Sequence, residues 1–218
     1  MTKRLTAIAA IVAGTMAAVS CETKEPDYQS IWAKTPVAST TSTTPTGKAV
    51  PLARYLQDLG VTGQQVAPGN LSDLTVSMPT PPGWTQANNP HIKPETVMIS
   101  KGGKFPTARL VVFKLYGDFD PAAVIKHGND DAQLFENFKQ LDASNADFNG
   151  FPSSQIQASY DLDGTRLHSW NRVVIPTGSA PPHQRYLVQL TVTGLADQAA
   201  AQATDIETII RGFSVTAK

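Results

Sequence analysis

The chain has little cysteine and no excess of charge of either sign. Its 218 residues include one cysteine, Cys21, and 18 Lys plus Arg against 18 Asp plus Glu. A single cysteine can form neither an intramolecular disulfide nor a zinc site built from clustered thiolates. A balanced charge gives no basic surface for nucleic acid. The sequence thus excludes a disulfide scaffold, a thiolate-bound zinc site and a general nucleic-acid binder.

Motifs for catalysis and metal binding are also missing from the sequence. There is no Gly-x-Ser-x-Gly motif, and Ser153-Ser154 begins a predicted strand instead of a sharp turn. No His-x-x-x-His pair would place two metal ligands on one helix face. The histidines stand singly and are read as surface or core side chains: His91, His127, His168 and His183. The sequence therefore predicts a protein that is not an enzyme and holds no cofactor.

Carboxylates gather in two places, which leaves metal binding as a minor hypothesis. The run Asp161-Leu162-Asp163-Gly164 starts like a calcium loop, but it lacks the third ligand and the closing glutamate. Asp-Gly between two apolar runs is the strongest short hairpin signal in the chain. The second group comprises Asp118, Asp120, Asp130 and Asp131. Asp120 before Pro121 is typical of a helix N-cap, so neither group predicts a metal site.

The N-terminal segment is typical of a secretory signal peptide. Lys3 and Arg4 precede fifteen uncharged, mostly apolar residues, 5–19. A membrane-spanning helix needs about 20 apolar residues, so this run is too short to span a bilayer. Residues 1–20 are therefore predicted to be a signal peptide.

Cys21 stands where the apolar run ends, after Ala18, Val19 and Ser20. This order resembles a bacterial lipoprotein signal, in which the cysteine receives a diacylglycerol group and an N-acyl chain such as palmitate. An ordinary cleaved signal with an incidental Cys21 is the alternative, but it would leave an odd thiol in an oxidising compartment. Two or more acyl chains make a stable anchor. We expect lipid attachment at Cys21 and a location on the outer face of the cell membrane, periplasmic or extracellular.

The composition after Cys21 predicts a tether followed by a folded domain. Residues 35–48 consist mainly of Thr, Ser and Pro and offer almost nothing that could be buried. We therefore expect a lipidated tether at 21–49 and one domain at 50–218.

The domain reads as a mixture of helices and strands. Helical spacing predicts a short helix from Pro51 to Gly60, a helix from Asp120 to about Phe138 with a weak point near Gly128, and a closing helix. In the closing helix, an apolar face is predicted from Ala196 through Ala199, Ala203, Ile206, Ile209 and Ile210 to Phe213. Strands are predicted at 74–78, 95–100, 107–115, 153–162, 165–176 and 185–194.

Two hairpin turns join predicted strands, one at Gly102-Gly103-Lys104 and one at Asp163-Gly164. Strands run in groups with interposed helices, without strict strand-helix-strand alternation. This arrangement predicts an α+β fold in which helices pack on an antiparallel sheet.

Several segments together resemble the mycobacterial LpqN/LpqT lipoprotein family, and LpqT-type members are the closer likeness. They are the lipoprotein signal, the tether, PLARYL, LTVSMPTPPGW, NGFPSSQIQASYDLDG, and RYLVQLTVTG followed by DIETIIRGF. The resemblance covers essentially residues 1–218, and segments 74–84 and 148–172 are the most specific. It implies an α+β layered sandwich like that of PsbP and Mog1, in an actinobacterial cell-envelope protein. The family supplies no catalytic motif to carry over.

Two functions remain open from the sequence. The first is an anchored, non-enzymatic lipoprotein that binds an envelope or host protein. The alternative is a carrier of an apolar ligand such as an envelope lipid or glycolipid, held between sheet and helices. Five aromatic residues could line such a pocket or belong to the core: Trp84, Phe105, Phe113, Phe119 and Trp170. The sequence leaves the ligand-binding residues unknown.

Overall fold

The structure is a computed structural model, and it describes residues 49–87, 90–181 and 183–218. Ten strands form most of this region. Their bounds are β1 Thr62–Val66, β2 Leu74–Ser77, β3 Thr85–Gln86, β4 Val97–Ser100, β5 Thr107–Tyr116, β6 Glu136–Ser144, β7 Ser153–Leu162, β8 Thr165–Val174, β9 Arg185–Leu195 and β10 Ser214–Ala217.

Three α-helices and four short 3₁₀ turns complete the described elements. They are α1 Leu52–Asp58, η2 Pro68–Asn70, α2 Pro121–Val124, η3 Ile125–His127, η4 Asp131–Leu134, η5 Ala196–Gln198 and α3 Ala199–Gly212. None of the helices in the described ranges is long and apolar enough to cross a bilayer.

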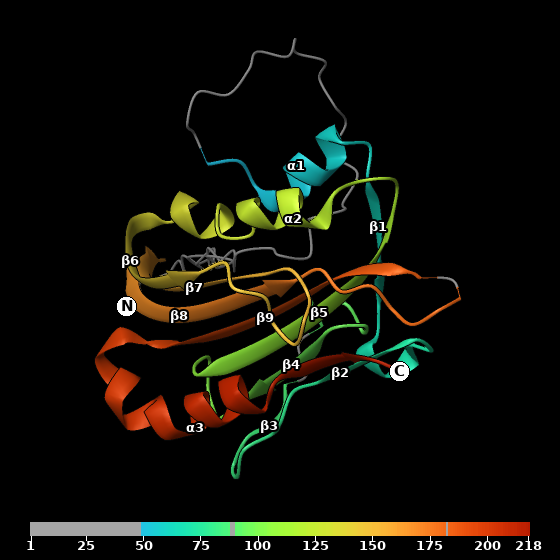
Figure 1. Cartoon of the computed structure of the whole chain (residues 1–218). Coiled ribbons are helices and arrows are strands. Elements are labelled where there is room, and N and C mark those ends of the chain that lie inside the picture. The colour runs from blue at the N-terminus through green and yellow to red at the C-terminus, as the bar shows by residue number, and fades with distance from the viewer. Residues whose placement is uncertain (1–48, 88–89, 182) are drawn as a thin grey trace, which may run out of the picture.

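Eight strands make one antiparallel sheet in the order β3-β4-β5-β9-β8-β7-β6, with β1 also paired to β5. Strands β2 and β10 form a separate two-stranded sheet. Figure 1 shows α1 and α2 on one side of the large sheet, and α3 with the small sheet on the other. This confirms the predicted α+β fold, an antiparallel sheet with helices packed on it.

A hydrophobic cluster fills each side of the large sheet. The alternation of side chains along β5 sends Leu110 and Val112 into the cluster under α3, and Val111 and Phe113 into the cluster under α1. Central strands buried on both faces need apolar residues at successive positions, and the run from Leu110 to Phe113 meets that need.

Both predicted hairpins are confirmed. Gly102 and Gly103 have φ values of 67° and 63°, and Asp163 and Gly164 have φ values of 50° and 73°. Asp163 and Gly164 alone connect the paired residues Leu162 and Thr165, and positive φ at both matches the right-handed twist of the two strands. Gly102 and Gly103 lie in a longer loop, since the last paired residues of β4 and β5 are Ser100 and Thr107. The short helix after Pro51 is also confirmed as α1, which ends just before Gly60.

The predicted helix from Asp120 to Phe138 is wrong beyond its first turns. Asp120 caps α2 by accepting a hydrogen bond from the Ala122 N–H at 2.9 Å, as expected. At Gly128, however, an added Cβ would lie 1.9 Å from Ser154 Oγ, so the chain packs directly on β7 there. It then continues through η4 into β6, whose backbone pairs with β7. Helical spacing of apolar residues did not reveal this strand.

Strands β1, β3, β6 and β10 were absent from the sequence-based prediction. In the closing helix, Ile209 is buried, Ile206 and Ile210 pack against the same cluster, and Phe213 just after the helix is buried, as predicted. Ala203, which was assigned to the apolar face, is exposed. The apolar face of α3 is thus narrower than the spacing suggested.

Candidate functional site

The sheet face that carries α1 and α2 changes from apolar to polar along its strands. Four buried polar side chains of β8 and β9 form what we call the polar strip: Ser169, Asn171, Gln189 and Thr191. Gln189 Nε2 and Thr191 Oγ1 both donate to Asn171 Oδ1 at 2.8 Å. Buried amides and hydroxyls are costly unless they are paired, and here they pair with one another.

Tyr160 on β7 extends the polar strip. Its hydroxyl bonds to the side chains of Ser169 and Thr193, and its ring stacks on Phe135 with centroids 4.1 Å apart. Burial raises the pKa of Tyr160, so this hydroxyl stays protonated at neutral pH. The strip therefore offers uncharged hydroxyl and amide groups beside an aromatic pair.

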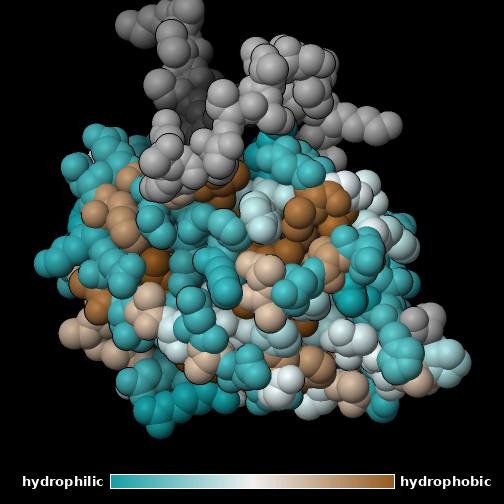
Figure 2. Space-filling model, turned by 45° about the horizontal axis from the view of Figure 1, so that its top comes forward, coloured by the Kyte–Doolittle hydropathy of each residue, from teal (hydrophilic) through white to brown (hydrophobic). Residues whose placement is uncertain are grey.

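The β6 side of the molecule exposes large apolar side chains. Leu134 in η4 is 51% exposed and Leu141 in β6 is 49% exposed. A second pair, Leu59 and Tyr116, is exposed to 46% and 45% near α1 and the end of β5. Figure 2, which turns the α1 and α2 side forward, shows hydrophobic side chains reaching the surface in separate spots among hydrophilic ones.

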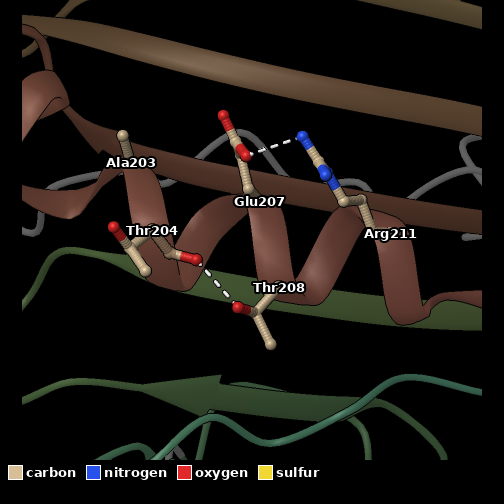
Figure 3. A pocket seen from close by; sticks show the side chains of 5 residues that line it. All are labelled: Ala203, Thr204, Glu207, Thr208 and Arg211. Carbon is tan, nitrogen blue, oxygen red and sulfur yellow. Dashed lines mark hydrogen bonds and ion pairs between the residues drawn. The ribbon is translucent and has the colours of Figure 1, made fainter.

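The outer face of α3 carries a shallow hollow of about 250 Å³ (Figure 3). All its lining residues come from this one helix: Ala203, Thr204, Glu207, Thr208 and Arg211. Glu207 and Arg211 form an ion pair at 3.0 Å, and Thr208 Oγ1 donates to the Thr204 carbonyl at 2.8 Å. No second element converges on the hollow in the described structure, so it has the character of an ordinary helix surface.

The structure does not bring the five candidate aromatic residues together. Trp84 and Trp170 belong to the cluster under α3, whereas Phe113 and Phe119 belong to the cluster under α1. Phe105 is half-buried outside both clusters. Four of the five aromatic residues therefore belong to the core, which was one of the two interpretations. The five do not line a common pocket.

The histidines and carboxylates lie in separate local contacts. His127 Nδ1 lies 2.9 Å from Asp130 Oδ2, and its ring stacks on Tyr55. His168 Nε2 lies 2.8 Å from Gln157 Nε2, and burial lowers its pKa. His91 and His183 are exposed at other places on the surface. Over 49–87, 90–181 and 183–218, no three His, Cys, Asp or Glu residues cluster as metal ligands would.

The carboxylates of the two acidic groups have structural partners. Asp161 accepts hydrogen bonds from Asn137 and Arg166, which lower its pKa, and Asp163 sits in the hairpin turn. Asp131 accepts from the Leu52 N–H at 3.1 Å, and Asp118 lies 3.7 Å from Arg185. Cys21 lies outside the described residues.

Sequence reasoning missed the polar strip, although a signal for it was present. In β9, Gln189 and Thr191 alternate with Val188, Leu190 and Val192. Side chains of a strand alternate between the two faces of the sheet, so this pattern places the polar residues of β9 together on one face. That face is then not covered by a continuous hydrophobic core.

A sequence model of the family described as "Probable lipoprotein LpqN" matches residues 48–216. Lipoprotein LpqT of Mycobacterium leprae is 64% identical over 210 residues, which cover 96% of this chain and 95% of the relative.

Among solved structures, LpqN of Mycobacterium tuberculosis, described as involved in cell envelope biogenesis, superposes with a TM-score of 0.66 at 22% identity. The match covers 78% of this chain and 99% of LpqN. Cyanobacterial PsbP from Synechocystis is a more distant neighbour, with a TM-score of 0.42, 14% identity, and coverage of 67% and 95%. The family model and the LpqT relative show that the chain belongs to the LpqN family of lipoproteins, with similarity to LpqT.

Proposed function

We propose that this protein is a lipid-anchored, non-enzymatic binding protein of the cell envelope whose domain docks a protein partner from the envelope or the host. The exposed leucines Leu134 and Leu141 carry this proposal. Both core clusters are made of buried side chains, whereas these two leucines, one in η4 and one in β6, remain about half exposed. Exposed apolar side chains that the core does not use can serve as the apolar centre of a protein interface, within a polar rim.

The anchor belongs to the same proposal. Membership in a lipoprotein family supports acylation at Cys21, with residues 1–20 removed and residues 21–49 as the tether before the domain. We expect Cys21→Ala to move the protein from the membrane fraction to the soluble fraction, because two or more acyl chains are needed for stable anchoring. Fractionation of the native host would test this. Retention of the variant in the membrane fraction would contradict acylation at Cys21.

The absence of a sequence motif for catalysis supports the non-enzymatic part. LpqN of M. tuberculosis is described as involved in cell envelope biogenesis, and we extend that setting to this chain.

Cross-linking of the full chain in its native cells, with identification of the linked peptides by mass spectrometry, tests the docking proposal. The double variant Leu134→Asn, Leu141→Asn should lose the partner. A matched control is Leu59→Asn, Tyr116→Asn, because these residues are equally exposed on another part of the surface. Equal partner recovery in the two double variants would rule out the leucine surface as the docking site.

The polar strip favours a second candidate function, the binding of an amphiphile. Its uncharged amides and hydroxyls lie on the same sheet face as the apolar cluster under α1, so a polar head group and an apolar chain could each find matching side chains. Native mass spectrometry of the full chain, purified without detergent, should then find a bound lipid mass that Asn171→Leu removes. A clean unliganded mass for the unaltered chain would reject this candidate.

A further inference from the structure

We propose that the partner binds as an extended segment that pairs with the free edge of β6 and adds a strand to the large sheet. This inference rests on the proposed function, since it names the kind of partner and the contact that holds it. It specifies a backbone-mediated contact in place of a general apolar one.

The position of β6 in the sheet supports this inference. β6 ends the strand order and, among the residues that the structure describes, pairs only with β7. All of its side chains except that of Phe138 are exposed. The N–H and C=O groups along an uncovered edge are a template for another strand, so the occupant that fits it is extended polypeptide.

The length of β6 distinguishes it from the opposite edge. β6 has nine residues, about 30 Å of edge, whereas β3 at the other end of the order has two and β1, which pairs with β5 off the main order, has five. Natural edges are commonly protected by covering segments, short length, proline, charged side chains or bulges. β6 has charged side chains and two register shifts against β7, but it has no proline, and in the described residues nothing buries it. Its pairing with β7 is regular at 139–140 and 142–144, so these stretches are the template for an added strand.

The charges of β6 indicate the chemistry of the docked segment. Glu136, Lys139 and Asp142 lie in register with Asp161, Ser159 and Gln157 of β7, which places them on one face. No ion pair joins Lys139 or Glu136 to another described residue. A complementary strand therefore carries a basic, an acidic and a basic side chain opposite Glu136, Lys139 and Asp142. Opposite charges across two strands stabilise their pairing, and like charges destabilise it.

The order of charges in β6 argues against a second copy of this chain as the occupant. Read in either direction, the order is acidic, basic, acidic at Glu136, Lys139 and Asp142. Two antiparallel β6 strands paired so that all three positions meet would place Glu136 opposite Asp142 and Lys139 opposite its own copy, which sets like charges against each other. We therefore assign the edge to a different protein.

The test uses the full chain in its native cells, with a photo-reactive amino acid in place of Leu141 and, separately, in place of Thr204 on α3. The cross-linked peptides are identified by mass spectrometry. The charge variant is Lys139→Glu, and the matched control is Lys126→Glu, an exposed lysine in η3. Equal melting temperatures of the purified variants establish that each one is folded.

We expect cross-links from position 141 to one segment of a different protein, reduced at least tenfold by Lys139→Glu and unchanged by Lys126→Glu. A tenfold loss corresponds to about 1.4 kcal/mol. Links to a second copy, links to lipid alone, or insensitivity to Lys139→Glu would overturn the inference. Cross-links to a protein from position 204, with none from position 141, would overturn the pairing with β6. They would leave the proposed function, binding of a protein partner, standing. An absence of protein links from both positions would count against the proposed function as well.

Discussion

Asp73 is a buried carboxylate that joins three distant parts of the chain. Tyr186 Oη donates to Asp73 Oδ1 at 2.6 Å, and the Asp73 carbonyl accepts hydrogen bonds from the N–H groups of Ser179 and Lys218. Burial, aided by the bond to Asp73, raises the pKa of Tyr186 above its ordinary value. The tyrosine therefore remains a donor at any physiological pH, and the carboxylate retains a partner.

Gly178 is required where the chain passes this carboxylate. A Cβ at position 178 would lie 2.0 Å from Asp73 Oδ2, and no space remains for a methyl group. We expect Gly178→Ala to lower the free energy of unfolding by about 2 kcal/mol. Urea denaturation measures this loss. Gly69→Ala is the control, because nothing lies within 4 Å of its added Cβ, and an equal loss there would disprove the steric explanation.

Asp205 on α3 links the helix to two other segments. Its Oδ2 accepts from Lys101 Nζ at 2.6 Å and from Trp84 Nε1 at 3.1 Å. The hydrogen bond from Lys101, followed by that from Trp84, lowers the pKa of Asp205 below the ordinary 3.8. A carboxyl group whose pKa is lower in the folded chain than in the unfolded chain stabilises the fold at pH values above its unfolded-state pKa. This stabilisation is lost as the pH falls through its folded-state pKa.

We therefore expect Asp205→Asn to melt a few degrees below the unaltered chain at pH 7, with the difference shrinking as the pH falls below 3.8. Melting curves at several pH values, followed by Trp fluorescence, measure it. Asp147→Asn, at an exposed site, should show no such trend. A difference that persists undiminished in acid would show that the ionised carboxylate is not the cause.

At the scale of elements, α3 packs on the large sheet through Ile209 and the partly buried Ile206 and Ile210. Ile209 is its only buried residue, and it is fully enclosed by the cluster under the sheet. Ile209→Ala should cost about 3 kcal/mol of unfolding free energy, because it removes buried methyl groups and leaves a cavity. The exposed Thr208→Ala should change stability by less than about 0.5 kcal/mol. Similar effects in the two variants, measured by urea denaturation, would mean that α3 is not held by this side chain.

Elements with strong local signals were predictable, and those defined by distant partners were not. The hairpin at Asp163-Gly164 is fixed by two adjacent residues that tolerate positive φ. β6 has no such signal, since Phe135 and Phe138 fit a helical stripe as well as they fit a strand. Its conformation is decided by β7, which supplies the pairing partners, and by the close approach of Gly128 to Ser154.

At the scale of the whole molecule, the two core clusters draw on residues between Leu52 and Val215. We expect residues 49–218, produced alone, to unfold cooperatively with a melting temperature within about 2 °C of the chain from residue 22, because a Ser/Thr/Pro-rich tether has little to bury against the core. Calorimetry of both forms measures this. A large drop in the shorter form would show that the tether contributes to the fold and would contradict the predicted boundary at residue 50.

The sequence by itself determined the α+β class, both hairpin turns and the family, because these depend on local backbone preferences and on segments specific enough to identify a relative. It also carried the signals from which we predict a lipid anchor at Cys21. Only the tertiary structure decided that the polar residues of β8 and β9 meet in one strip and that β6 ends the strand order of the large sheet in the described residues. Neighbours across a sheet lie far apart in the chain, so the pairing of strands, and not the local pattern, decides which side chains meet and which edge stays open.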